Sequence, residues 1–147
     1  MKAWIWLRVL CGIFVFFLAG HTVGVLTPPR AESPAAAVYS TMAAVRFPAM
    51  GFERTYGEFY RGFGLFVTVG FAVLAVFSWQ VSAVSRRDAQ AAMPMAMTLL
   101  AASVGSAVLS GLYFFTAPMV MSAAAVACAV VVIALLARER GLSRVAA

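Results

Sequence analysis

Three long stretches of the chain carry no Lys, Arg, Asp or Glu, and they constrain the fold more than any other feature. They cover residues 9–29, 62–85 and 89–137, and His21 is the only side chain within them that can gain a positive charge near neutral pH. A helix needs about 20 apolar residues to cross the roughly 30 Å hydrocarbon core of a bilayer. The first two stretches therefore fit one crossing each, and the third fits two crossings with a turn between them.

The turn in the third stretch is placed by Thr116, Ala117 and Pro118, which follow three aromatic residues at 113–115. We expect transmembrane helices over about 4–26, 58–84, 91–115 and 118–137, in a single domain that covers residues 1–147. Because backbone amides in lipid must be satisfied within a helix or a closed barrel, the expected fold class is all-α, a four-helix transmembrane bundle. A content of 64% hydrophobic and 11% charged residues agrees with this, since soluble domains have about 45–50% apolar and about 25% charged residues.

The longest connection, residues 27–57, is expected to cap one end of the bundle. Its middle part, 35–50, is compatible with a helix, and Val38, Met42 and Val45 follow one another at the spacing of one helix face. Two interpretations remain open for this segment. It can form a short amphipathic helix that lies on the membrane, or an ordered cap that packs on the bundle.

The distribution of Lys and Arg predicts the orientation. With four crossings, one side carries both termini and the 85–89 turn, with a net charge of +5, and the other side carries +1, which together make the +6 of the chain. The more basic side normally faces the cytoplasm, so both termini are expected there. The basic residues are too dispersed to form a nucleic-acid surface, so no nucleic-acid partner is expected.

A group of polar side chains is expected to gather at the outer ends of the helices. The candidate ligand-binding residues are His21, Thr22, Glu58, Tyr60, Arg61 and Tyr113. Ionisable residues inside a membrane are costly and therefore mark candidate functional sites. His21 is the deepest of these residues, and Glu58 is its expected partner, either as an acid–base pair or simply as part of a hydrogen-bonded contact between helices.

A second set of residues is small and suits close helix packing. We assign this role to Gly20, Gly24, Gly62, Gly64, Ser106 and Ser110, because small residues allow helices in a membrane to approach closely. The two cysteines, Cys11 and Cys128, lie within expected spans and have no metal-ligand spacing. No metal site is therefore predicted, and no catalytic residue is assigned.

Four short segments resemble a family of small bacterial four-helix integral membrane proteins of uncharacterised function. They are HTVG at 21–24, YGEFYRGFG at 56–64, WQ at 79–80 and YFFTAP at 113–118. The resemblance spans nearly the whole chain, and the patterns coincide in order and spacing. A more distant architectural likeness is to DoxX-type four-helix proteins. The resemblance is to bacterial proteins, so we expect a multi-pass protein of the bacterial cytoplasmic (inner) membrane, and the Lys and Arg distribution then places the long connection outside. The resemblance carries over no site residue.

Two classes of function remain as hypotheses. The first is a non-enzymatic accessory or scaffolding subunit that packs against other integral membrane proteins or against itself, surrounded by membrane lipids. The second is a binder or enzyme for a lipophilic molecule, such as a quinone, isoprenoid or sterol-like lipid, at the cluster of His21, Glu58 and the tyrosines. Ligation of haem or a pigment by His21 is a lesser alternative, and no cofactor is predicted.

Overall fold

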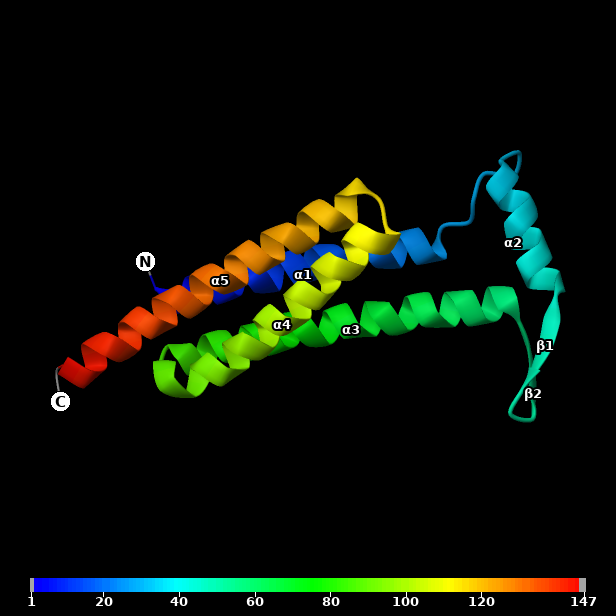
Figure 1. The fold of residues 1–147 in the computed structure, drawn as a ribbon. Coiled ribbons are helices and arrows are strands. Elements are labelled where there is room, and N and C mark those ends of the chain that lie inside the picture. The colour runs from blue at the N-terminus through cyan, green and yellow to red at the C-terminus, as the bar shows by residue number, and fades with distance from the viewer. Residues whose placement is uncertain (1, 146–147) are drawn as a thin grey trace. The chain divides into compact units, whose positions relative to one another are not determined.

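The computed structural model describes residues 2–145 as five helices and one β-hairpin (Figure 1). Four helices are long and apolar enough to cross a membrane, as expected for a multi-pass membrane protein. In chain order the elements are α1 (Ala3–Leu26), α2 (Pro34–Ala44), β1 (Arg46–Ala49), β2 (Phe52–Thr55), α3 (Tyr56–Ser85), α4 (Ala89–Tyr113) and α5 (Thr116–Val145). The predicted all-α class with four membrane-length helices is confirmed, and the two-stranded hairpin is a small addition to it.

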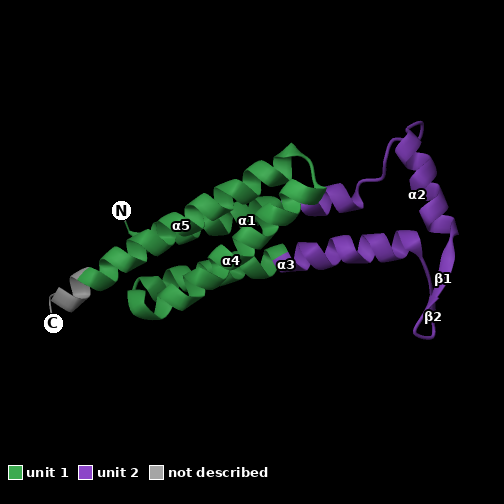
Figure 2. Ribbon diagram, in the orientation of Figure 1, with its two compact units in different colours: residues 1–17, 71–147 green, residues 18–70 purple. Residues whose placement is uncertain are grey.

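The chain divides into two compact units, which are coloured separately in Figure 2. Unit 1 combines residues 1–17 of the N-terminal region with 71–147, and unit 2 is the continuous segment 18–70. Helices α1 and α3 thus each contribute one part to either unit. The expected core of the bundle belongs to unit 1, and most of the predicted polar site belongs to unit 2.

In unit 1, the first part of α1 packs among the last part of α3, α4 and α5. Its fully buried side chains include Leu7, Leu10 and Phe14. Polar contacts tie the same helix to its neighbours: the Arg8 Nε–H donates to Ser82 Oγ at 2.9 Å, and the Cys128 thiol donates to the Trp6 carbonyl at 3.2 Å. Such contacts leave few polar groups unsatisfied in an apolar surrounding.

Helices α4 and α5 form an antiparallel pair whose ends follow from local sequence. Asp88 caps α4 by accepting from the backbone N–H groups of Gln90 and Ala91, and Pro94 lies inside the helix. The last helix differs from the expectation at its far end, because it continues beyond 137 to Val145. Gly141 does not end it, since a single glycine weakens a helix without forbidding it.

In unit 2, the connection between α1 and α3 contains the expected short helix and a hairpin that was not expected. Ser33 caps α2 through its hydroxyl and Pro34 occupies the first turn, where its missing N–H costs little. Strands β1 and β2 then pair antiparallel from Arg46–Thr55 to Ala49–Phe52. The hairpin leads directly into α3, which begins at Tyr56 rather than at the expected Glu58.

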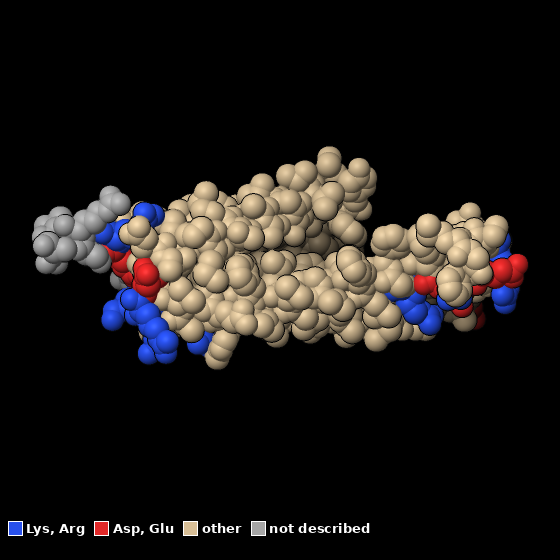
Figure 3. Space-filling view, turned by 90° about the horizontal axis from the view of Figure 1, so that it is seen from below, with Lys and Arg blue, Asp and Glu red and all other residues tan. Residues whose placement is uncertain are grey.

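The charged side chains lie at the ends of the units rather than along the apolar helices. In unit 1, Figure 3 shows Lys and Arg gathered near the α3–α4 turn and the N-terminus, and in unit 2 it shows the charges over α2, the hairpin and the start of α3. The helix surface on this face is uncharged. This distribution is the one that a bilayer requires.

Candidate functional site

A pocket of about 330 Å³ lies within unit 2 where α2, the hairpin and the ends of α1 and α3 meet. It is lined by Val25, Tyr39, Met42, Ala43, Thr55, Gly57, Glu58, Tyr60, Arg61, Gly62 and Leu65. Small-molecule sites in proteins typically measure about 300–1,000 Å³, so the volume suits a small ligand or part of a larger one. Of the residues expected at a site, Glu58, Tyr60, Arg61 and Gly62 are brought together here.

Glu58 is held by a capping box at the start of α3. Its backbone N–H donates to Thr55 Oγ1 at 3.0 Å, and its carboxylate accepts from the Thr55 backbone N–H at 2.8 Å. This reciprocal pair satisfies two backbone donors that a helix N-terminus otherwise leaves open. The carboxylate therefore has a structural role. The T-x-x-E spacing at 55–58 is the sequence pattern that indicates it.

His21 lies deeper than Glu58 and has a different partner. Its Nε2 is 2.9 Å from the carbonyl oxygen of Gly64, which fixes the proton on Nε2 because a carbonyl can only accept. Gly64 lies six residues after Glu58, which is about 9 Å further along the helix. The expected His21–Glu58 pair is therefore replaced by two separate contacts, and His21 joins α1 to the backbone of α3.

Two further contacts continue this junction between α1 and α3. Thr22 donates to the Leu18 carbonyl at 2.6 Å and lies 3.5 Å from the Thr68 hydroxyl. A Cβ atom on Gly64 would lie only 2.7 and 2.9 Å from the two methyl groups of Val25. Gly64 is thus a close-packing glycine, as predicted, and the junction forms one wall of the pocket through Val25.

The other predicted packing glycines do not pack within the chain. A Cβ atom on Gly20, Gly24 or Gly62 would meet no atom within 4 Å among the described residues. Gly57, which had no predicted role, is closer to a neighbour, since its Cβ would lie 3.4 Å from the backbone of α2 at Ala43. Gly62 therefore leaves space in the pocket. Gly20 and Gly24 lie one helical turn apart on α1, and we call this surface without close neighbours the bare strip.

The polar rim of the pocket consists mainly of hydrogen-bond donors. Tyr39 of α2 and Tyr60 of α3 approach edge to face, with ring centroids 6.0 Å apart. Burial and the neighbouring Tyr60 raise the pKa of Tyr39 above its ordinary value, so its hydroxyl remains protonated and can donate. Arg61 is exposed and forms no ion pair with any residue of the described part of the chain. Tyr39 was not predicted, because nothing in the sequence shows which face of α2 meets α3.

The remaining predicted residues belong to unit 1. Tyr113 is 75% exposed at the end of α4 and does not line this pocket. Ser110 is buried and forms a hydrogen bond of 3.1 Å with Ser122 of α5, and Ser106 is half-buried on the same helix. Within the described residues, no group of His, Cys, Asp and Glu could hold a metal ion.

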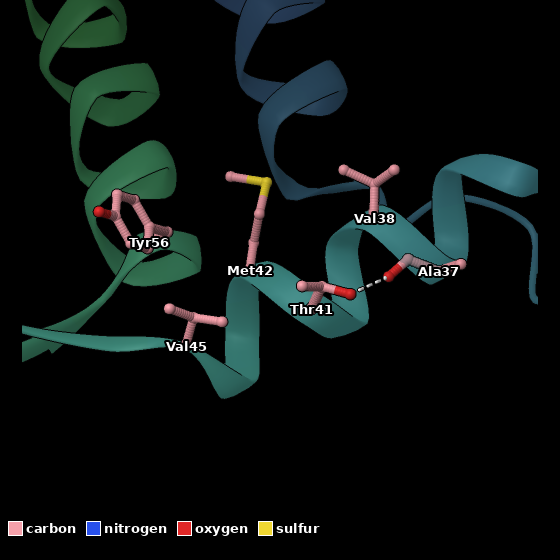
Figure 4. A pocket seen from close by; sticks show the side chains of 6 residues that line it. All are labelled: Ala37, Val38, Thr41, Met42, Val45 and Tyr56. Carbon is pink, nitrogen blue, oxygen red and sulfur yellow. Dashed lines mark hydrogen bonds between the residues drawn. The ribbon is translucent and has the colours of Figure 1, made fainter.

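A second hollow, wider and more open, lies along α2. It has a volume of about 460 Å³ and is lined by Ala37, Val38, Thr41, Met42, Val45 and Tyr56 (Figure 4). Val38, Met42 and Val45 therefore share one face, as their spacing predicted. In the close-up, Val38 and Met42 point toward the side on which α1 and α3 lie, so the apolar face of α2 is directed at the membrane-spanning helices.

Comparisons of the chain with protein-family models, with curated proteins and with solved structures find no match.

Proposed function

We propose that the protein binds an amphipathic, lipid-like molecule in the pocket formed by α2, β2 and the ends of α1 and α3. The observation that carries the proposal is the arrangement of its lining. Apolar side chains of Val25, Met42 and Leu65 share the pocket with the donors of Tyr60 and Arg61. Sites for small molecules are typically apolar, with a few polar groups that fix the orientation of the ligand.

The polar rim indicates the kind of head group. The hydroxyls of Tyr39 and Tyr60 can donate, and the guanidinium of Arg61 has only donors. Glu58 uses its carboxylate for the helix cap, so it competes little for the ligand. These groups favour a head group with carbonyl, phosphate or carboxylate oxygens, which includes quinones and anionic lipids. His21 acts in this proposal as the residue that holds α1 against α3, and not as an acid, a base or an axial ligand.

The direct test is retention of a lipid by pocket variants. The protein is purified in mild detergent, and bound small molecules are extracted and identified by mass spectrometry. Gly62→Leu should occupy part of the pocket, because Gly62 lines it and nothing lies within 4 Å of its Cβ position. The matched control is Gly70→Leu, which makes the same change in α3 at a position that is equally open and outside the pocket.

The wild type and Gly70→Leu should both retain one lipophilic species in a near-stoichiometric amount, and Gly62→Leu should lose it. Arg61→Gln and Tyr60→Phe should retain less of it. Equal retention by the two leucine variants would show that the pocket is not the binding site. Thermal unfolding of both variants in the same detergent distinguishes loss of ligand from loss of fold.

The bare strip on α1 favours a second function, that of an accessory subunit packing against another membrane protein or a second copy. Gly20 and Gly24 have the small-xxx-small spacing used in close contacts between membrane helices, and a Cβ atom added at either would meet no described atom within 4 Å. Gly20→Leu and Gly24→Leu should then abolish co-purification of a protein partner or cross-linking of a dimer. Gly12→Leu, at another open glycine of α1, serves as the control. Equal recovery of the partner from all three variants would exclude this surface.

We further propose that the protein belongs to a bacterial inner membrane, with both termini in the cytoplasm and the long connection, residues 27–57, on the outer side. The support is the partition of charge, +5 against +1, between the two sets of loops. A cysteine at Ser33 should react with an impermeant thiol reagent in intact cells, and one at Ser143 should be protected. The reverse labelling pattern would show that the protein has the opposite orientation.

A further inference from the structure

The hairpin between α2 and α3 ends in a turn whose residues are unusual for its geometry. Met50 and Gly51 both have positive φ, +49° and +88°, as in the two-residue type I′ turn that suits a twisted hairpin. Asn-Gly and Asp-Gly are the usual sequences there, because a bulky residue is disfavoured in the left-handed region. The methionine side chain therefore does not favour the backbone conformation of this turn, and its presence needs another explanation.

Met50 also contributes nothing to packing within the chain. Its side chain is 101% exposed, and the neighbouring Phe52 is 64% exposed. An exposed pair of large apolar residues at the tip of a turn is costly in water and is explained by a partner that covers it. The two sides of the hairpin show where that partner lies.

The strand register divides the hairpin into two faces of different character. Phe47, Ala49, Phe52 and Arg54 share one face, because Phe47 pairs with Arg54 and Ala49 pairs with Phe52. On the opposite face, Arg46 and Glu53 form an exposed ion pair at 3.9 Å. One face is therefore mainly apolar, and the other is charged and hydrated.

The apolar face is the one turned toward the membrane-spanning helix. The ring of Phe47 lies 4.7 Å from that of Tyr56 and 5.6 Å from that of Phe59, both in the first turns of α3. Within unit 2, the hairpin extends across the N-terminal end of α3 rather than along its axis (Figure 2). The face that carries Phe52 is thus directed to the side on which α3 enters the bilayer.

From these contacts we infer that the hairpin is an interfacial anchor: its tip, Met50 and Phe52, lies among the head groups and upper acyl chains of the lipids around the protein. Aromatic and apolar residues are favoured at this depth, with basic residues beside them near the phosphates. Arg54 fits that role, because its guanidinium carbon lies 5.4 Å from the centre of the Phe52 ring on the same face. The apolar face of α2 points the same way, toward α1 and α3.

Spin-label accessibility tests this inference without assuming any function. In a background with Cys11→Ala and Cys128→Ser, a nitroxide is attached to single cysteines at Met50, Phe52, Pro48 and Glu53. The protein is reconstituted in nanodiscs of phosphatidylcholine and phosphatidylglycerol. Collision rates are then measured with oxygen, which concentrates in lipid, and with a neutral nickel chelate, which remains in water.

Labels at 50 and 52 should collide several-fold more with oxygen than with the chelate, and labels at 48 and 53 on the hydrated face should show the reverse. Met50→Asn suits the turn but removes the apolar tip, so it should shift a label at 52 toward the chelate. If labels at 50 and 52 are as accessible to the chelate as those at 48 and 53, the tip stands in water. The lipid anchor is then refuted, and a water-soluble protein partner becomes the better explanation of the exposed tip.

Discussion

Gly64 provides the sharpest test of how α1 and α3 are joined. In Gly64→Ala the new Cβ atom would lie 2.7 and 2.9 Å from the methyl groups of Val25. Valine in a helix has one strongly preferred rotamer, so these methyl groups cannot turn away, and the helices must separate instead. Separation would also lengthen the 2.9 Å hydrogen bond from His21 to the Gly64 carbonyl.

The expected magnitude follows from two opposing effects. Overpacking a close contact costs about 1–3 kcal/mol. Alanine is favoured over glycine in a helix by about 1 kcal/mol. Gly64→Ala should therefore lower the free energy of unfolding by up to about 2 kcal/mol. Gly70→Ala has the same intrinsic gain and no neighbour within 4 Å, so the difference between the two variants isolates the clash.

The measurement is unfolding by sodium dodecyl sulfate in mixed micelles, followed by far-UV circular dichroism. Val25→Ala removes the opposing methyl groups, so the double variant Gly64→Ala with Val25→Ala should lose less stability than the sum of the single changes. The coupling expected for residues in contact is about 0.5–3 kcal/mol. Equal stability of Gly64→Ala and Gly70→Ala, or strictly additive losses, would refute the close contact.

Two further predictions follow from single hydrogen bonds. Thr55→Ala removes one half of the capping box with Glu58, so it should lower the free energy of unfolding by about 1 kcal/mol, and Thr55→Ser should restore most of it. Ser110→Ala leaves the buried Ser122 hydroxyl without its partner in α4, and hydrogen bonds between membrane helices contribute about 0.6 kcal/mol on average. If Ser110→Ala lowers the free energy of unfolding by more than about 2 kcal/mol in the same titration, Ser110 contributes more to stability than this hydrogen bond explains.

The membrane helices could be predicted from the sequence because their signal is long and redundant. Each apolar stretch without charge specifies a crossing regardless of its neighbours, so small errors, such as the start of α3 at Tyr56, did not alter the fold. A short helix within 35–50 was one of two open interpretations, based on the spacing of Val38, Met42 and Val45. The structure has α2 at Pro34–Ala44, and β1 follows it. The hairpin was missed because Met50-Gly51 is not the usual turn sequence, and its strands have only four residues each.

The candidate site was predictable only in part, because its residues depend on how helices are rotated about their axes. Glu58, Tyr60 and Arg61 could be selected as polar residues at the expected start of a membrane helix, and the pocket contains all three. The sequence could not show that His21 faces the Gly64 carbonyl, since hydropathy places a residue in depth but not around the helix. The capping box at 55–58 was readable, and its recognition would have removed Glu58 as a partner for His21.

The order of polar groups along the first part of α3 follows the cost of placing charge in a bilayer. The carboxylate of Glu58 is at the helix start and the guanidinium of Arg61 follows within one turn. The imidazole of His21 then meets the helix at Gly64, and only hydroxyls meet at Thr68. The two charged groups thus lie in the first turns of α3, and the groups met further along the helix, at about 5.4 Å per turn, are an imidazole and hydroxyls, which are less costly to bury.

For the amphipathic ligand that we propose, the same order of groups would set its orientation in the pocket. A head group with acceptor oxygens is stabilised at the level of Arg61 and Tyr60, where donors are available and charge is tolerated. Its apolar part would lie further along α3, beside Val25 and Leu65 and near the contact between His21 and Gly64. A ligand in the reverse orientation would place its polar atoms beside apolar side chains and leave the Arg61 guanidinium without an acceptor. The polar residues at the start of α3 would therefore also determine which end of a lipid lies nearest the membrane surface.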